Sequence, residues 1–231
     1  MTNPSTDGGF AVVEMFTSQG CNSCPPAEEL LSEIERDARE RGQNVFALGF
    51  HVDYWDDLGW ADQFADAAYT ARQEAYARAL GTRGLYTPQM VVNGTVEFVG
   101  SDRRRAAGAI MSAMASTVTT PLTLSVANLG ADRVVLDYRA EGPPERAVLN
   151  AAIVERGLDS EIARGENAGR TLRQDNVVRA FRSVGLDAEQ GQVELVAPLG
   201  FDPQSASVVG FVQENGHRAI VGATAIELST A

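Results

Sequence analysis

The sequence predicts two structural segments: an α/β segment over residues 10–119 and an antiparallel, β-rich segment over residues 120–231. As far as Ser116, apolar runs typical of buried strands alternate with runs in which apolar residues recur at helical spacing. Beyond Pro121, short runs rich in β-branched residues are separated by turn residues. Residues 1–9 are small and mostly polar, which predicts a disordered N-terminal segment.

Within the α/β segment the expected order of elements is β-α-β-α-β-β-α. Asn93-Gly94 is a strong turn signal and predicts a hairpin between the last two strands. Pro25 and Pro26 suit the first turn of a helix, whose backbone donors need no partners, and Gly42 suits its end. Strands are expected over residues 10–16, 45–50, 86–92 and 95–99, and helices over residues 28–41, 62–80 and 102–116.

The β-rich segment predicts a β-sandwich-like domain, because several short strands follow one another with turn signals between them. A polar insert, residues 158–186, interrupts these strands, and its part from Asn176 to Val184 is expected to form a short helix. The expected strands are residues 122–127, 134–138, 148–154, 191–196, 207–211 and 220–228.

Composition limits the partners and the location of the protein. The formal net charge is −12, and all 19 basic residues are arginine, without a basic cluster, which argues against binding to nucleic acid or an anionic membrane. No apolar stretch approaches the roughly 20 residues that span a bilayer. The N-terminus lacks the apolar core of a signal peptide, so a cytoplasmic location stays open. The sequence does not specify an oligomeric state.

The candidate functional motif is Cys21-Asn22-Ser23-Cys24, which contains the only two cysteines. A strand that delivers such a pair to the start of a helix is typical of reversible dithiol–disulfide chemistry. The positive end of the helix would stabilise the Cys21 thiolate for attack, and Cys24 would resolve the mixed disulfide. The alternative is a fixed structural disulfide or two inert core thiols.

Four features of residues 10–116 together resemble the thioredoxin superfamily: a strand, the Cys-x-x-Cys motif, a helix, and a Thr87-Pro88 step before a hairpin. The resemblance implies that the Thr87–Pro88 peptide is cis, faces the sulfurs and shapes the substrate groove. It also implies that Glu14 is a buried acid that exchanges protons with the resolving thiol. By the residues alone, Glu14 could equally be an outward-facing strand residue.

The sequences of three motifs are similar to those of an uncharacterised bacterial family of thioredoxin-like proteins. Members of this family are often labelled as secreted, and they join such a domain to a C-terminal β-domain. The family has no firmly established substrate, and it implies a periplasmic or secreted location. It would place histidine where this chain has Gln174, which weakens a ligand role for the polar insert. The motifs are Val13-Glu14-Met15-Phe16-Thr17-Ser18-Gln19-Gly20-Cys21, Phe50-His51-Val52-Asp53-Tyr54-Trp55 and Tyr86-Thr87-Pro88-Gln89-Met90-Val91-Val92.

The loop 51–60 gathers both tryptophans, a histidine and three acids, and allows two interpretations. Its residues either pack as an ordinary edge of the domain or line the substrate site, with Trp55 and Asp53 as substrate-binding residues. His51 could add a third ligand to Cys21 and Cys24, since thiolate and imidazole suit copper(I) or zinc. In the insert, Glu166, Asn167, Arg170 and Arg173 are expected to form a solvated loop or a buried Arg–Glu pair.

These observations favour a thiol–disulfide oxidoreductase that uses Cys21 and Cys24 on a protein or small-molecule thiol or disulfide, with no cofactor beyond the redox-active disulfide. Two alternatives stay open. One is a copper-binding or copper-delivery protein that uses Cys21, Cys24 and His51. The other is a non-enzymatic binding module with a structural disulfide. The sequence does not specify the substrate or the direction of the redox reaction.

Overall fold

The computed structural model describes residues 8–228, so the expectation of disorder over residues 1–9 lies outside the described residues except at Gly8 and Gly9. The helices are α1 (Pro25–Arg41), α2 (Ala67–Leu80) and α3 (Arg103–Met114), and the 3₁₀ turns are η1 (Asp53–Leu58) and η2 (Pro203–Ser205). The strands are β1 (Ala11–Thr17), β2 (Val45–His51), β3 (Gln89–Val92), β4 (Val96–Val99), β5 (Leu122–Leu129), β6 (Arg133–Ala140), β7 (Val148–Glu155), β8 (Leu158–Glu161), β9 (Thr171–Gln174), β10 (Val177–Gly185), β11 (Gln190–Val196), β12 (Ala206–Gln213) and β13 (Ile220–Glu227).

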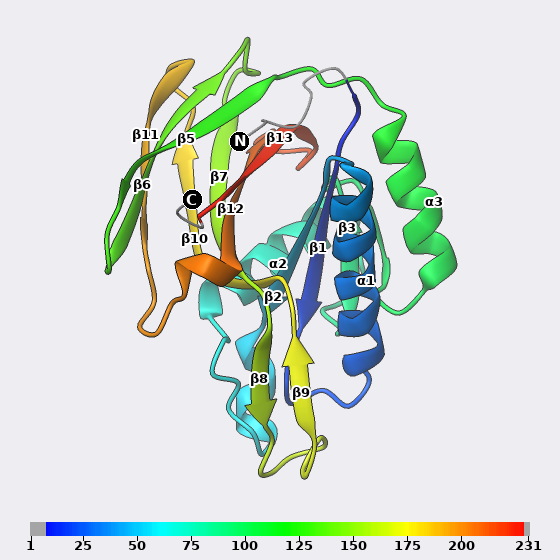
Figure 1. Ribbon diagram of the computed structural model, residues 1–231. Helices are drawn as coiled ribbons and strands as arrows, with labels where there is room; N and C mark the ends of the chain where they lie inside the picture. The colour runs from blue at the N-terminus through cyan, green and yellow to red at the C-terminus, as the bar shows by residue number, and fades with distance from the viewer. Residues whose placement is uncertain (1–7, 229–231) are drawn as a thin grey trace.

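One eight-stranded sheet, in the order β13-β12-β7-β10-β2-β1-β3-β4, contains strands from both segments of the sequence. A three-stranded sheet, β11-β6-β5, packs against the half of it formed by β7, β12 and β13, and their facing side chains form one apolar core. Helices α1 and α3 lie together at the other half (Figure 1). The hairpin β8–β9 projects beyond both sheets and reaches the lower end of β1 and α1.

Both faces of strand β1 are covered, and this explains why the central strands have continuous apolar sequences. Val13 and Met15 pack with α1 and α3, whereas Val12 and Phe16 face the opposite way and pack with α2. All seven residues of β1 are buried. The predicted hairpin at Asn93-Gly94 is confirmed, with β3 and β4 in antiparallel register.

Helix α1 begins and ends where its sequence signals predict. Pro25 and Pro26 occupy the first turn, and the C-cap residue Gly42 has a left-handed φ of 63° that allows its N–H to reach the carbonyls of the last turn. Leu30 and Leu31 are buried against the sheet. Each such leucine contributes roughly 1.5–3 kcal/mol to the free energy of folding, which fixes the helix on β1 and β2.

Two expected helices differ from the structure. The helix expected over residues 62–80 begins at Ala67, because the Asp62 side chain is used by the backbone N–H groups of Gln19 and Phe64, and Asp66 forms the N-cap instead. The short helix expected over residues 176–184 is wrong, because the segment forms strand β10. Pairing with β7 along its whole length satisfies its backbone groups and outweighs the local helical signal.

Strand β10 joins the two parts of the large sheet through very little pairing. It runs antiparallel to β7 over residues 177–185 but pairs with β2 only at Val177 and Gly49. The residues of β2 before Gly49 have no strand paired with them on this side. The sheet is continuous around Gly49 and open next to the first residues of β2.

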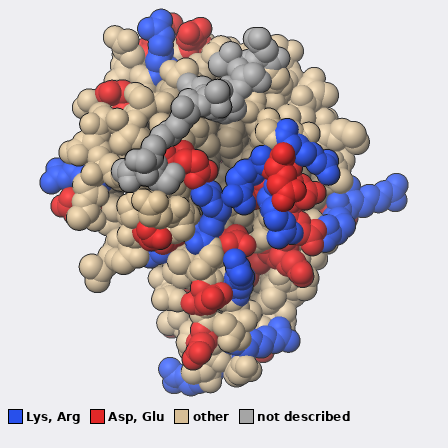
Figure 2. Space-filling model, in the orientation of Figure 1, with Lys and Arg blue, Asp and Glu red and all other residues tan. Residues whose placement is uncertain are grey.

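Charged side chains are mixed rather than segregated on the face drawn in Figure 2, where arginine and acidic side chains alternate over α1. Arg39 pairs with Glu35 and Arg41 with Asp37 within the helix, and Arg103 of α3 pairs with Glu33. This face therefore presents no patch of one sign. Within the described residues, no helix is long and apolar enough to cross a membrane.

Candidate functional site: the Cys21–Cys24 disulfide

Cys21 and Cys24 are joined by a disulfide at the start of α1. Strand β1 ends at Thr17, a turn bonds the Cys21 N–H to the Ser18 carbonyl, and Cys24 is the N-cap residue of the helix. No side chain caps the helix, so its first turn relies on the Cys24 carbonyl, which accepts hydrogen bonds from the N–H groups of Ala27 and Glu28. The positive end of the α1 dipole thus lies at the sulfurs.

The disulfide is covered, although the two residues between the cysteines are exposed. Both cysteines have 0% of their surface exposed. The loop of the β8–β9 hairpin lies across the turn: Asn167, itself 1% exposed, donates from Nδ2 to the carbonyls of Gln19 (2.9 Å) and Cys21 (3.0 Å). Glu166 accepts a hydrogen bond from the Asn22 N–H at 3.1 Å. The hairpin therefore forms a cover over the cysteine turn.

A second set of polar contacts anchors this cover below the turn. Gln19 Nε2 donates to Ser160 Oγ (2.9 Å) on β8 and to Gln174 Oε1 (2.8 Å) on β9. Trp60 Nε1 donates to Gln19 Oε1 at 2.9 Å, and the same tryptophan packs against Gly165 in the hairpin loop. Because Gln19 is fully buried, losing these contacts would leave its amide unsatisfied.

Thr87, Pro88 and Trp55 lie together beside the cysteine turn. The Thr87–Pro88 peptide is cis, as the resemblance implied. A Cβ added to Gly100 would lie 3.1 Å from Pro88 Cβ and 3.2 Å from Ala27 Cβ, so Pro88 is close to the first turn of α1. Trp55 Nε1 donates to Thr87 Oγ1 at 2.9 Å, and its Cβ side packs on Gly20.

The side chains of Asp53 and Glu14 form their contacts with α2, away from the cysteine turn. Asp53 accepts a hydrogen bond from Thr70 Oγ1 in α2 at 2.5 Å, which ties η1 to that helix. Glu14 is buried, but its carboxylate is directed to α2, on the sheet face opposite α1. There Arg72 donates to it twice, at 2.5 and 3.0 Å, and the Tyr76 hydroxyl donates a further hydrogen bond. The structure does not bring these two acids to the turn that carries the sulfurs.

The buried acid on the α1 side is Glu28, one helical turn after Cys24. Its Oε1 accepts a hydrogen bond from Thr17 Oγ1 at 2.6 Å, and burial raises the pKa of its carboxyl, against the opposing effect of the nearby His51. His51 Nδ1 lies 2.7 Å from Asp62 Oδ2. Burial alone would lower the pKa of His51, but the Asp62 carboxylate outweighs it and raises that pKa. Burial likewise opposes ionisation of Asp62, and His51 reverses this and lowers the pKa of Asp62.

His51 thus has a carboxylate partner, and the structure offers no ready-made set of metal ligands around it. Within residues 8–228, no group of three or more histidine, cysteine, aspartate or glutamate side chains is arranged to hold a metal ion. Gln174, where the family resemblance implied histidine, is buried and takes part in the hydrogen bonds of the cover.

Two features of the site were not assigned by sequence reasoning. Glu28 could have been predicted from the sequence, because it follows the N-cap residue Cys24 by four positions and therefore lies on the same face of the helix. Asn167 could not have been predicted from the sequence. Its partners Gln19 and Cys21 lie nearly 150 residues earlier in the chain, and it contacts them only because the hairpin packs there. The sequence predicts a solvated loop or a buried Arg–Glu pair for this polar group. Glu166, Arg170 and Arg173 are exposed, as a solvated loop requires, and Asn167 is buried.

The fold and the site define an α/β protein that carries a Cys-x-x-Cys disulfide at the start of a helix, under a β-hairpin cover. Residues 12–213 match the model of the family described as "Protein of unknown function (DUF1223)", and the chain belongs to that family. A search of curated proteins found no match.

Among solved structures, the chain is similar to the crystal structure of protein AGR_C_4864 from Agrobacterium tumefaciens, with 31% sequence identity and a TM-score of 0.71 over 96% of this chain and 95% of that one. Two structures of a β-glucosidase from Kluyveromyces marxianus, one with selenomethionine and one with glucose, also match. Both are 12% identical over 49% of this chain and 14% of theirs, with TM-scores of 0.25 and 0.23. Scores this low carry no argument.

Proposed function

We propose that the protein is a thiol–disulfide oxidoreductase of thioredoxin-like organisation that reacts through Cys21 and Cys24. The observation that carries the proposal is the disulfide between these residues at the first turn of α1, where the helix dipole favours a thiolate. The cis Thr87–Pro88 peptide and Trp55 beside the turn supply the surface on which a substrate would lie.

The proposed reaction exchanges one disulfide for another. A substrate thiolate attacks Cys21 Sγ, a bond forms between these two sulfurs, and the Cys21–Cys24 bond breaks with its electron pair leaving on Cys24. A second substrate thiolate then attacks the substrate sulfur of the mixed disulfide and releases Cys21 as a thiolate. The substrate leaves oxidised and the protein holds two thiols. In the opposite direction the same steps reduce a substrate disulfide.

Glu28 is the group we propose to exchange a proton with Cys24. It follows Cys24 by one turn, it is buried, and its raised pKa brings it closer to neutral pH than an ordinary glutamate. Glu28→Gln should slow the step in which Cys24 leaves Cys21, or in the opposite direction attacks Cys21 in the mixed disulfide, and should leave the alkylation rate of Cys21 unchanged. Rapid-quench analysis of the mixed disulfide would measure this, and equal slowing of both steps would count against the role.

The experiment that tests the main proposal is a redox titration of the purified chain in glutathione buffers, read by alkylation of free thiols. We expect a midpoint within the range of known thiol oxidoreductases, roughly −120 to −270 mV. We also expect Cys21 in the reduced chain to alkylate with a pKa below the free value of about 8.5. Cys24→Ser should trap a mixed disulfide at Cys21.

The complete burial of both cysteines specifically favours a second candidate, a binding module in which the disulfide is structural. The same titration separates the two. A midpoint below about −300 mV, with loss of folded structure on reduction, would exclude the redox function and support the structural one.

A further inference from the structure

A buried polar group lies under the cysteine turn, and the proposed reaction uses only one of its members, Glu28. Thr17 and His51 are register partners at the ends of β1 and β2, so their side chains lie on the same face of the sheet, toward α1. Thr17 Oγ1 donates to Glu28 Oε1 at 2.6 Å, and His51 Nδ1 lies 2.7 Å from Asp62 Oδ2. All four residues are buried.

Asp62 connects this group to the turn that carries the sulfurs. The oxygen that faces His51 also accepts the Gln19 N–H at 2.7 Å, and Gln19 directly precedes the cysteine turn. The other oxygen of Asp62 accepts the Phe64 N–H at 2.9 Å. Burial opposes ionisation of Asp62, but His51 and these N–H groups outweigh it and lower the pKa of the carboxyl. An ionised Asp62 therefore holds the imidazole in place beneath the turn.

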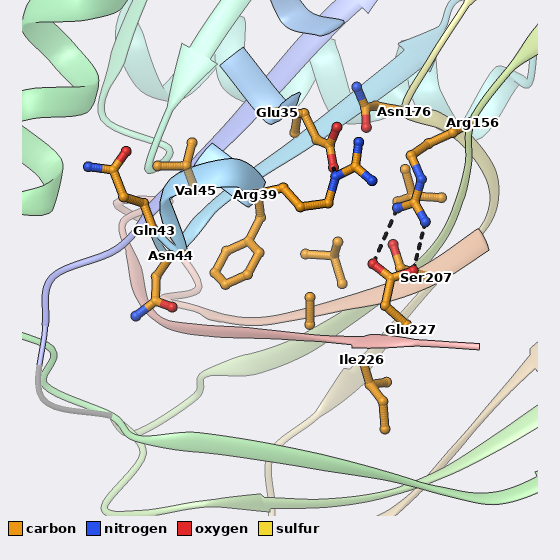
Figure 3. A pocket seen from close by; sticks show the side chains of 16 residues that line it. Glu35, Arg39, Gln43, Asn44, Val45, Arg156, Asn176, Ser207, Ile226 and Glu227 are labelled. Atoms are coloured by element: carbon orange, nitrogen blue, oxygen red, sulfur yellow. Dashed lines mark hydrogen bonds and ion pairs between the residues drawn. The ribbon is translucent and has the colours of Figure 1, made fainter. Parts of the chain in front are cut away.

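Glu28 lacks the arginine partner that other glutamates of the molecule have. Glu14 is buried against Arg72. Figure 3 shows Glu227, on the wall of a cavity lined by β2 and β13, with two hydrogen bonds from Arg156. No arginine of the described residues acts on Glu28 in this way. Its carboxylate must therefore be stabilised by a different positive group.

That positive group is His51. The groups that act on Glu28 come from the elements packed around it: Thr17 of β1, His51 of β2, Asp62 after η1 and Gln174 of β9. Burial raises the pKa of Glu28, and of these groups only His51 can oppose it with a positive charge. Burial and the nearby Arg179 of β10 disfavour protonation of His51, but Asp62 and Glu28 outweigh them and raise its pKa.

We propose, on the basis of the thiol–disulfide oxidoreductase function, that His51, held by Asp62, is a positioning residue for proton transfer from Cys24 to Glu28. Its imidazolium keeps the Glu28 carboxylate ionised and able to accept a proton. In the resolving step the Cys24 thiol gives its proton to Glu28 and its sulfur bonds to Cys21 Sγ. The bond between Cys21 and the substrate breaks, and its electron pair leaves on the substrate sulfur as a thiolate. Glu28 borders a surface groove between α1 and β9, through which the proton returns to water.

The first test follows the reduced full chain with dithiobis(nitrobenzoate), a disulfide whose thiolate product is coloured. Attack by Cys21 releases one thiolate and resolution by Cys24 releases another, so the two steps are read as two phases. His51→Gln should slow the second phase roughly tenfold on the acidic side of its pH profile, because Glu28 then stays protonated to higher pH. The second-phase rates of variant and parent should converge at alkaline pH. His217→Gln, at an exposed turn, is the matched control and should change neither phase.

A double-mutant cycle separates a role through Glu28 from a merely structural role. In a Glu28→Gln background, His51→Gln should cause no further slowing of the second phase. The same slowing in both backgrounds would overturn the proposal, and so would an unchanged second-phase pH profile in His51→Gln. A parent chain that releases no second thiolate would refute the oxidoreductase function itself and this role of His51 with it.

A reciprocal measurement needs no substitution of His51 and so does not depend on whether that variant folds. The chain has only two histidines, so an NMR titration of the oxidised protein resolves both imidazoles. Because coupling between two titrating groups is mutual, Glu28→Gln should lower the pKa of His51 and leave the exposed His217 unchanged. A pKa of His51 that is equal in the variant and the parent would overturn the proposal.

Discussion

At the scale of single residues, the environment of Cys21 is defined by the helix end and by Ser23. Ser23 Oγ lies 3.3 Å from Cys21 Sγ, and no basic side chain follows Cys24, where Pro25 stands. In the reduced protein the serine hydroxyl is therefore placed to donate to a Cys21 thiolate. This donor adds to the helix dipole as a reason for a lowered thiol pKa.

Ser23→Ala should raise the pKa of Cys21 in the reduced protein. We expect a change of about one unit or less, since a hydrogen bond to a charged group contributes on the order of 1.5 kcal/mol and Ser23 is exposed to water. The pH dependence of iodoacetamide alkylation measures it. Ser32→Ala, whose hydroxyl bonds to the Glu28 carbonyl, is the matched control. An alkylation pKa identical in the variant and the parent would show that Ser23 does not stabilise the Cys21 thiolate.

The His51–Asp62 pair should make stability depend on pH. The folded pKa of His51 is above its ordinary value of 6.5, so its stabilising contribution is complete below pH 6.5 and is lost as pH rises through the folded pKa. The folded pKa of Asp62 is below 3.8, so its contribution is present above pH 3.8 and is lost as pH falls through the folded pKa. The pair is therefore fully effective between about pH 4 and 6.5.

His51→Gln should reduce the free energy of unfolding by about 3 kcal/mol at pH 6, because Asp62 then loses a buried partner. The difference from the parent should shrink as pH rises above 6.5. Urea unfolding of the oxidised protein from pH 5 to 9 measures both effects. His217→Gln, in the exposed β12–β13 turn, should change neither. Parallel stability profiles for His51→Gln and the parent would show that the pair does not titrate as expected.

At the scale of elements, the hairpin β8–β9 covers the turn that carries the disulfide. Glu166 and Asn167 hold it to the cysteine turn through three hydrogen bonds. Hydrogen bonds contribute about 1 kcal/mol each, so these three contribute on the order of 3 kcal/mol to holding the hairpin over the turn, beside the anchoring contacts of Gln19. Because Cys21 is fully buried, thiol exchange at its sulfur requires the hairpin to move away from the turn.

Asn167→Ala should accelerate reduction of the disulfide by dithiothreitol roughly thirtyfold, since two hydrogen bonds of about 1 kcal/mol each that hold the closed hairpin are lost. Alkylation of the free thiols at set times, followed by mass spectrometry, gives the rate of disulfide reduction. Asn128→Ala, at an exposed position of β5, is the control. Urea unfolding of each variant separates a local effect from a global one. A reduction rate unaffected by Asn167→Ala would mean that the hairpin does not limit access.

The sequence predicted elements better than it predicted their contacts. The Cys-x-x-Cys turn, helix α1 and the hairpin at Asn93-Gly94 follow from local signals, and the structure contains them. Strand β10 did not follow, because its conformation depends on pairing with β7 and β2. The hairpin cover did not follow either, because its function as a cover rests on contacts between residues far apart in the chain.

At the scale of the whole molecule, one buried arginine connects the two segments. Arg72 pairs with Glu14 on β1 and donates to Gln213 on β12 at 3.3 Å. Its guanidinium lies over four aromatic rings, two of which, Phe181 and Phe211, belong to the second segment. Residues before and after position 119 thus share one polar and aromatic core.

Arg72→Met should destabilise the whole chain by about 3–5 kcal/mol, because the buried Glu14 carboxyl would be left without its ion-pair partner. We expect a single urea transition, with far-UV and near-UV circular dichroism coincident. The double variant Glu14→Met/Arg72→Met removes both charges and should recover part of the loss. Two separate transitions, of which only one moves, would instead show that the segments on either side of residue 119 unfold independently.

Strand β9 ends at Gln174, which anchors the hairpin to Gln19, and two residues later the Asn176 carbonyl accepts a hydrogen bond from the Gly49 N–H of β2. One short stretch of backbone thus holds both the disulfide cover and the junction of the large sheet. Thermodynamic linkage makes any coupling between the disulfide and the fold reciprocal: if oxidation stabilises the folded state by some factor, the disulfide is harder to reduce in the folded chain than in the unfolded chain by that same factor. Urea unfolding of the two redox forms and redox titrations with and without urea must therefore return the same value.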